Sequence, residues 1–131
     1  MDKDEIVTYW KSSSLGDFEL AHSLYESKRY VYCLFFIHLS IEKLLKGLIA
    51  DKTTSPVPYE HNLVRLSGAA GIAFSEEQLD LLTDMTAFNI KARYDDYKNQ
   101  FAKVATREYT EKYLLQADQF ILWLKTHFRK I

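Results

Sequence analysis

The chain has 131 residues, of which 47% are hydrophobic and 15% aromatic. This composition argues against disorder and predicts a single folded domain over residues 1–131. The formal net charge of −1 excludes a basic field over the whole protein, so any contact with nucleic acid must come from a local patch. Only four glycines and two prolines occur, which favours long helices over strands and tight turns.

Signals for export or membrane insertion are not evident in the sequence. No basic start leads into an apolar signal region, and no charge-free stretch reaches membrane-spanning length. We therefore expect a cytoplasmic protein that does not contact a membrane. The single cysteine, Cys33, lies in an apolar segment, and a buried structural thiol is expected there rather than a nucleophile.

The first helix is predicted to begin at the capping pattern Asp2 to Glu5 and to run to about Ser27. One stripe is expected to face the core: Ile6, Trp10, Ser13, Asp17, Leu20, Ala21 and Leu24.

Asp17 is the charged member of that stripe. A carboxylate on a core-facing side needs a hydrogen bond or a cation. The candidate cations are Lys43, Lys46 and Arg93, and a structural tie is favoured over a catalytic acid.

A polar turn at residues 26–29 predicts an antiparallel hairpin with a second helix over residues 30–49. That helix is apolar on nearly every side, which places it at the centre of a bundle. Its wide core face comprises Tyr30, Leu34, Ile37, Ile41, Leu44, Leu45 and Leu48.

A polar line, formed by His38, Glu42 and Lys46, runs along another side of this helix at i, i+4 and i+8. One interpretation is a solvated Glu–Lys pair at a helix edge. The other is a polar seam beside a binding groove or a subunit interface, since Phe35 and Leu39 point almost the same way.

Residues 51–59 contain both prolines and form the longest clear loop. A short helix capped by Asn62 follows and ends near Gly71. His61 could be a ligand or an acid–base group, but no second His or Cys stands at metal-site spacing. We therefore favour a hydrogen-bonding turn histidine, and we expect neither a metal nor a cofactor.

A capping box at residues 75–78 predicts the next helix, which carries Leu81, Leu82, Met85 and Phe88 on one stripe to about Asn89. Residues 89–100 are favoured as a solvated loop by composition.

The same segment is the most functional in character, because a basic and aromatic mixture suits phosphate contact and base stacking. Its candidate ligand-binding residues are Lys91, Arg93, Tyr94 and Lys98, with Tyr97 between them. Asp95 and Asp96 can neutralise the same cations, and two adjacent carboxylates are a weak indication of a metal site.

Thr106 is predicted to cap the last helix. Its buried face comprises Tyr113, Ala117, Phe120, Ile121, Leu124 and Phe128. Leu115, Leu122 and Trp123 lie off that face, which predicts a second contact, with an irregular neighbour or with another subunit. The fold expected from all these elements is all-α, an up-and-down four-helix bundle with an additional short helix.

In order and spacing, several pieces of this sequence resemble the HEPN domain family. They are Trp10, Asp17-Phe-Glu-Leu-Ala21, Arg29-Tyr30, Ile41-Glu-Lys-Leu-Leu-Lys46, His61-Asn-Leu63 and Ala92-Arg-Tyr94. The resemblance implies a four-helix bundle with a short extra helix, usually a homodimer. It also implies one of two activities: a metal-independent ribonuclease with an Arg-x4-6-His motif, or a nucleotide-binding partner of a minimal nucleotidyltransferase in a toxin–antitoxin pair.

The nuclease pattern is incomplete. The fourth to seventh residues after Arg93 include no histidine, and Arg65 and Arg107 are likewise not followed by one at that spacing. Lys98 stands in the window after Arg93, but a lysine with a pKa of about 10.4 is a poor general base at neutral pH. Arg93 is thus a candidate catalytic residue, but the histidine that would complete the motif is missing.

Three hypotheses follow. The first is an RNA- or nucleotide-contacting member of a nucleotidyltransferase-linked toxin–antitoxin pair, in which a polar seam supports Arg93. The seam comprises Asp17, His38, Glu42, Lys43, Lys46 and His61. The second is a ribonuclease toxin that pairs Arg93 with Lys98, His61 or His38. The third is a helical dimerisation module without catalysis, associating through Leu122 and Trp123.

Overall fold

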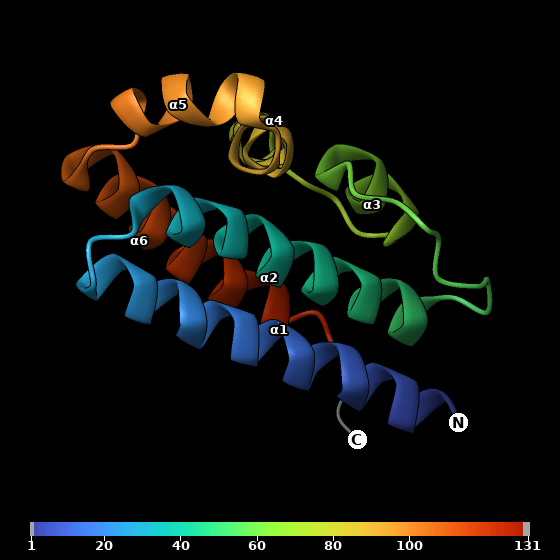
Figure 1. Ribbon diagram of the computed structural model, residues 1–131. Helices are drawn as coiled ribbons and strands as arrows, with labels where there is room; N and C mark the ends of the chain where they lie inside the picture. Colours follow the sequence, from blue (N-terminus) through green and yellow to red (C-terminus); the bar gives the residue numbers. More distant parts are fainter. Residues whose placement is uncertain (1, 130–131) are drawn as a thin grey trace.

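The computed structural model describes residues 2–129, apart from the side chain of Asp95 (Figure 1). This part of the chain folds into helices without a strand. They are α1 (Lys3–Glu26), α2 (Tyr30–Lys52), α3 (Leu63–Ala69), α4 (Glu76–Arg93), α5 (Asp95–Val104) and α6 (Arg107–Lys125). The expected all-α bundle is confirmed, with α1, α2, α4 and α6 as its long helices and α3 as the short one.

The additional helix α5 corrects the expectation of a loop at residues 89–100. α4 continues to Arg93, and α5 begins at once after Tyr94, whose extended backbone separates the two helices. Polar composition indicated a loop, but Phe101 and Ala105 give this segment an apolar side that is buried in the core. Packing of that side stabilises a helix whose other side is polar.

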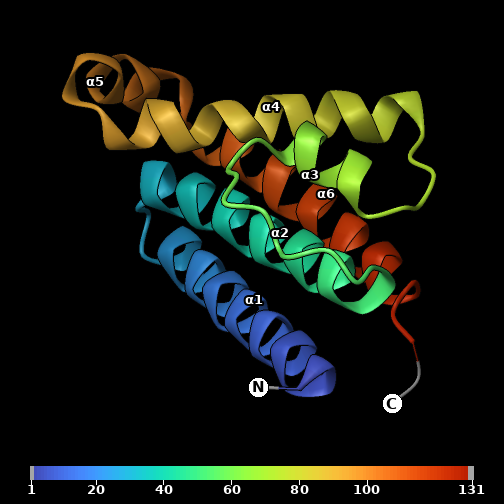
Figure 2. The same ribbon diagram turned by 90° about the vertical axis from the view of Figure 1, so that its right-hand side faces the viewer.

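Helix α2 is the centre of the molecule. It packs against α1, α3, α4, α5 and α6. Figure 1 shows it between α1 and the layer of α3 and α4, and Figure 2 shows α4 running above α2 and α6. All the expected core residues of α2 are buried except Tyr30, which is half-buried. Burial raises the pKa of the Cys33 thiol to about 12, as expected for a structural cysteine.

The buried side of α1 differs from the predicted stripe by about one residue position. Val7, Ser14, Phe18 and Ala21 are buried, whereas Leu20 is 42% exposed. The reason is that Ser14 is an interface residue, because its hydroxyl donates to the carbonyl of Ser40 at 2.6 Å. A satisfied hydroxyl can lie between packed helices. Apolar periodicity therefore placed the centre of the buried side about one position away, although Ala21 is buried and the rest of the predicted stripe except Leu20 is half-buried.

Close packing of α1 on α2 depends on Gly47. A Cβ atom at this position would lie 3.1 Å from the Cβ of Trp10 and 3.5 Å from the ring of Phe128. At the other end of the hairpin, Lys28 takes a left-handed φ of 63°. Its N–H and that of Arg29 close the end of α1 by donating to earlier carbonyls of the helix.

The C-terminal segment is bonded to the end of α2 and to the start of α1. The backbone N–H of Arg129 donates to the buried carboxylate of Asp51 at 2.8 Å, and its Nε donates to the same carboxylate at 2.6 Å. Its Nη2 also bonds Asp4 at 2.6 Å. Burial alone would raise the pKa of Asp51, but the hydrogen bonds from Arg129 outweigh it and hold that pKa below its ordinary value.

The predicted caps are confirmed. Asn62 accepts from the backbone of Val64 at 3.0 Å, and Thr106 accepts from that of Tyr109 at 3.2 Å. Ser75 and Gln78 form the complete capping box at the start of α4. Across the described residues, no helix is long and apolar enough to cross a membrane.

The off-face residues of α6 differ in their surroundings. Trp123 packs against Phe74, in the segment between α3 and α4, with ring centroids 5.5 Å apart, so its second contact is with an irregular neighbour. Leu115 and Leu122 are exposed. The predicted buried face of α6 is confirmed, with Phe128 half-buried.

Candidate functional site

Three buried ionisable side chains of α2 meet the half-exposed His61 of the loop at residues 53–62. We call these four residues the buried cluster: His38, Glu42, Lys46 and His61. Glu42 is 4% exposed and Lys46 is 6% exposed. The interpretation of this pair as a solvated helix edge is therefore wrong. Burial of charge is costly unless each group is paired, and the contacts of Glu42 supply that pairing.

Glu42 is the centre of the cluster. One carboxylate oxygen accepts from the Nδ1 of His61 at 2.9 Å, and the other lies 3.2 Å from the Nζ of Lys46. The ammonium of Lys46 also lies 5.6 Å from the centroid of the Trp10 ring, where cation–π attraction helps to replace lost hydration. Because His61 donates from Nδ1, its Nε2 is left as the acceptor nitrogen of the neutral ring.

His38 adjoins this pair and is fully buried. Its Nε2 donates to the backbone carbonyl of His61 at 2.9 Å, so the two histidines are linked through the chain rather than through their rings. Burial lowers the pKa of His38, although the carbonyl of His61 and the carboxylate of Glu42 oppose that effect. His38 is thus a neutral structural donor, which removes it from the candidate acid–base groups.

The pair of Asp17 and Lys43 is a separate tie. Their carboxylate and ammonium lie 2.7 Å apart, each side chain about one-fifth exposed, and they join α1 to α2. Of the three candidate cations, Lys43 is thus the partner of Asp17, and its structural role stays a prediction. The expected seam therefore divides into this helix–helix tie and the buried cluster.

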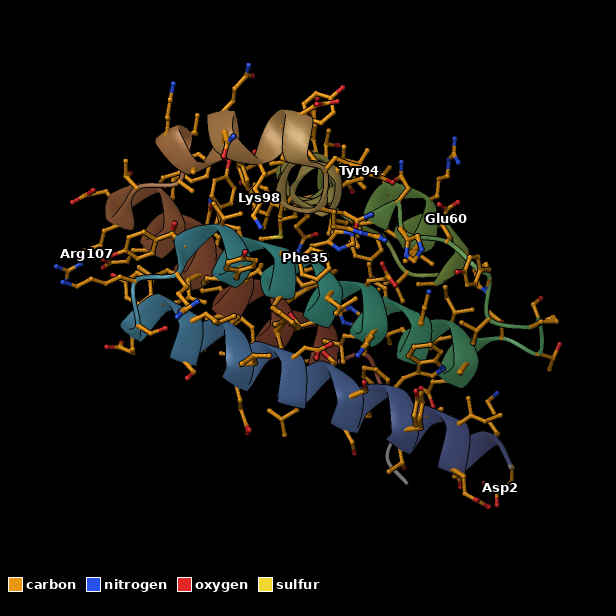
Figure 3. All side chains as sticks on the ribbon, in the orientation of Figure 1. Asp2, Phe35, Glu60, Tyr94, Lys98 and Arg107 are labelled. Carbon is orange, nitrogen blue, oxygen red and sulfur yellow. The ribbon has the colours of Figure 1, made fainter. Side chains whose placement is uncertain are left out.

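The α4–α5 junction holds the remaining candidates, and we call Lys91, Arg93, Tyr94 and Tyr97 the junction site. Arg93 is exposed, and its guanidinium makes a long contact of 3.5 Å to the amide oxygen of Asn89. Tyr94 is 56% exposed and Tyr97 is 53% exposed. Figure 3 shows Tyr94 where α4 meets α5.

A small pocket of about 150 Å³ adjoins this site, lined by Lys91, Tyr97, Gln100, Phe101 and Val104. The ammonium of Lys91 lies 5.8 Å from the centroid of the buried Phe101 ring. The pocket is thus a shallow aromatic recess with a cation at its rim, large enough for part of a base or a sugar.

Lys98 is placed differently from the other predicted ligands. Its Nζ donates to the hydroxyl of Tyr32 at 2.6 Å and lies 4.5 Å from the centroid of that ring. The ammonium is therefore engaged between α5 and the start of α2 (Figure 3). A phosphate ligand would have to compete with this contact for the Lys98 ammonium.

Between the buried cluster and Arg93, the described side chains form no direct hydrogen bond. The nearest contact to α4 is made by the N–H of Leu63, two residues after His61, which donates to the hydroxyl of Thr86 at 3.1 Å. Thr86 and Arg93 lie on the same face of α4, separated by seven residues or about 10 Å of helix rise. The contact with Asn89 turns the Arg93 side chain back toward Thr86.

Sequence reasoning missed Tyr32, Asn89 and Phe101 as neighbours of the candidate residues. Asn89 could have been found, since it precedes Arg93 by four positions on one helix. Tyr32 could not, because its contact with Lys98 spans 66 positions. Among the residues that the structure describes, no group of His, Cys, Asp or Glu has the arrangement of a metal site.

Comparison with known proteins assigns the fold to a family. No curated protein matches the chain. Among solved structures, the crystal structure of TT1696 from Thermus thermophilus is similar, with a TM-score of 0.79 and 18% sequence identity. The match covers 93% of this chain and 98% of that one, and at this identity it shows a shared fold. The family model of the HEPN domain matches residues 7–127, so the chain belongs to the HEPN domain family.

Proposed function

We propose that this protein is the RNA- or nucleotide-contacting member of a nucleotidyltransferase-linked toxin–antitoxin pair. The observation that carries the proposal is the junction site, where Arg93, Tyr94 and Tyr97 are exposed, and where Lys91 and Tyr97 line an aromatic recess. Arg93 can pair with a phosphate in a bidentate manner. Tyr94 and Tyr97 offer faces on which a base can stack.

The direct test is binding of the dinucleotide UpU and of AMP, measured by isothermal titration calorimetry at low salt. We expect Arg93→Ala to weaken binding by about tenfold, the loss of one charge-assisted phosphate contact. Arg65→Ala is the matched control, because Arg65 is an exposed arginine on α3 whose partner is Glu60 at 3.5 Å. Absence of binding by the wild type, or equal losses in both variants, would contradict the proposal.

The second part of the proposed function concerns the protein partner, a minimal nucleotidyltransferase. The support is membership of the HEPN family together with the missing nuclease histidine after Arg93. If the neighbouring gene encodes such an enzyme, the two proteins should co-elute after co-expression from their own gene pair. Separate elution at micromolar concentration would count against this part.

A second candidate function is a metal-independent ribonuclease. Of the three residues that could act with Arg93, the geometry favours His61 over Lys98 and His38. A half-exposed imidazole that donates to a buried carboxylate has the arrangement of a general base and its orienting group. RNA cleavage in the presence of EDTA, lost in both His61→Ala and Arg93→Ala but kept in Lys98→Met, is the expected result for this candidate. Intact RNA with the wild type eliminates it.

Homodimerisation is the remaining proposal. Its support is the pair of exposed leucines on one side of α6, Leu115 and Leu122, because Trp123 is already covered by its own chain. We expect a dimer in sedimentation equilibrium that dissociates on Leu122→Asp. A monomeric wild type would exclude homodimerisation, and an unchanged dimer would exclude this face.

A further inference from the structure

A second group of cations, separate from the junction site, gathers at one end of the bundle. Lys28 and Arg29 form the α1–α2 turn, Lys103 lies in the last turn of α5, and Arg107 begins α6. All four are exposed, and we call them the basic end. Figure 1 shows the α1–α2 turn and the α5–α6 turn at the same end of the molecule, and Figure 3 labels Arg107 there.

A direct contact joins the two turns. The Nε of Arg107 donates to the hydroxyl of Tyr25 at 3.4 Å, and that hydroxyl donates to Glu111 at 2.8 Å. The bond to Tyr25 raises the pKa of Arg107, which stays charged. Two other carboxylates, those of Glu26 and Glu108, lie at this end and are exposed. The hydrogen bond from the neutral Tyr25 hydroxyl leaves the negative charge of Glu111 in place, so the four cations of the basic end exceed its three carboxylates by one.

Lys28 is held in a backbone conformation that is unfavourable in free energy for a lysine. Its φ of 63° lies in the left-handed region, and helices that end in this way most often have glycine at that position. The backbone hydrogen bonds of the turn would form equally well with glycine, because they come from main-chain N–H groups. The lysine side chain therefore adds charge, and not stability, at the tip of the turn.

Helix α5 connects the basic end to the junction site. It has 10 residues and so spans roughly 15 Å, with Tyr94 at its start and Lys103 near its end. Lys98 lies between them and is the second lysine of α5, with its ammonium held against Tyr32. A single strand that stacks a base on Tyr94 and follows α5 would bring later phosphates to Lys103 and Lys28, whereas a dinucleotide is too short to do so.

We propose that the basic end binds the phosphodiester backbone of single-stranded nucleic acid, so that the ligand of this protein is a polymer rather than a mononucleotide. The inference rests on the proposed function for the position of the first bases. Cations without exposed aromatic groups give contact with phosphates and not with particular bases. The surface therefore sets the length dependence and the salt dependence of binding, and it confers no sequence preference.

The test compares a 12-nucleotide oligo(U) with UpU by fluorescence anisotropy over a series of salt concentrations. The variant Lys28→Gly/Lys103→Ala removes two cations from the basic end. Its control, Lys52→Ala/Lys125→Ala, removes two exposed lysines that lie at the C-terminal ends of α2 and α6. Neither substitution in the first variant removes a side-chain bond that holds the described fold together, and thermal unfolding checks that both proteins are folded.

The first variant is expected to bind oligo(U) at least tenfold more weakly, with UpU binding unchanged. Its slope of log K against log salt should be smaller by about 1.4, from roughly 0.7 for each lost contact with a single strand. The control should stay within twofold of the wild type. Equal binding of oligo(U) by the first variant and the wild type, or an equal loss in the control, would overturn the proposal.

Arg93→Ala separates this proposal from the proposed function. It should weaken both UpU and oligo(U), since it acts at the junction site. If Arg93→Ala changes neither ligand while Lys28→Gly/Lys103→Ala still weakens oligo(U), the junction site fails and the basic end stands.

Discussion

Glu42 and His61 are joined by a hydrogen bond of 2.9 Å across 19 positions of sequence. The bond fastens the loop of residues 53–62 to the central helix at a point where the carboxylate is buried and the imidazole reaches the surface. Glu42 also holds Lys46. Its removal therefore affects one buried cation and one loop at the same time.

Glu42→Ala should destabilise the protein by about 3–5 kcal/mol, because it leaves the ammonium of Lys46 buried without a counter-charge. Urea unfolding followed by circular dichroism measures the change in the free energy of unfolding. Glu19→Ala, at an exposed position of α1, is the control and should stay within about 0.5 kcal/mol. A loss below about 1 kcal/mol for Glu42→Ala would mean that water reaches the cluster.

The buried His38 predicts a loss of stability in mild acid. Burial lowers its pKa in the folded state, so the unfolded chain takes up a proton near pH 6.5 before the folded protein does. Stability from this group is full above the unfolded pKa and falls as pH decreases toward the folded pKa, by up to about 1.4 kcal/mol per pH unit. Urea unfolding between about pH 7.5 and pH 5 measures the slope.

His38→Gln should flatten that profile, even if it lowers stability at every pH. His127→Gln is the comparison, since His127 lies in the C-terminal segment and is half-buried, and it should keep the slope of the wild type. An unchanged slope in His38→Gln would assign the acid sensitivity to other groups.

The long helices were predictable from the sequence, because caps and apolar stripes are local signals. Thr106 and Asn62 needed only their own neighbours to be identified as caps. The rotation of α1 was not predictable, since the bond from Ser14 to Ser40 links different helices. Helix α5 was missed for the same reason, because the burial of Phe101 depends on contact with Phe88 of α4.

In the candidate site, too, the local contacts were predictable from the sequence and the contacts between helices were not. The i, i+4 spacing of Glu42 and Lys46 predicted their pair, but nothing local placed Tyr32 against Lys98. The sequence therefore identified residues with suitable chemistry, and the tertiary structure decided which of them remain open to a ligand.

Two of the residues in the described range 2–129, Lys28 and Gly71, have left-handed backbones and give a matched pair of stability predictions. Lys28→Gly should stabilise the protein by about 0.5–1 kcal/mol, because glycine adopts a positive φ without steric cost. Gly71→Ala, at φ 73°, should destabilise it by about 1–2 kcal/mol. Thermal unfolding of both variants measures the difference, and a destabilised Lys28→Gly would show that the lysine side chain supports the turn.

The C-terminal tie predicts coupling between Asp51 and Arg129. Arg129→Ala removes the cationic partner of the buried Asp51 carboxylate and leaves it the backbone N–H of residue 129, whereas Asp51→Asn keeps an acceptor for that N–H. A double-mutant cycle should give a coupling energy of about 1–2 kcal/mol, discounted because the Arg129 side chain is 42% exposed. Additive effects within about 0.3 kcal/mol would mean that the contact contributes nothing measurable.

The central claim, that the junction site contacts nucleic acid through Arg93, is tested most directly by the affinity for oligo(U) at low salt in Arg93→Ala and in Arg65→Ala. We expect the first variant to bind about tenfold more weakly than the wild type and the second to bind as the wild type does. Equal affinity in all three proteins would contradict the claim.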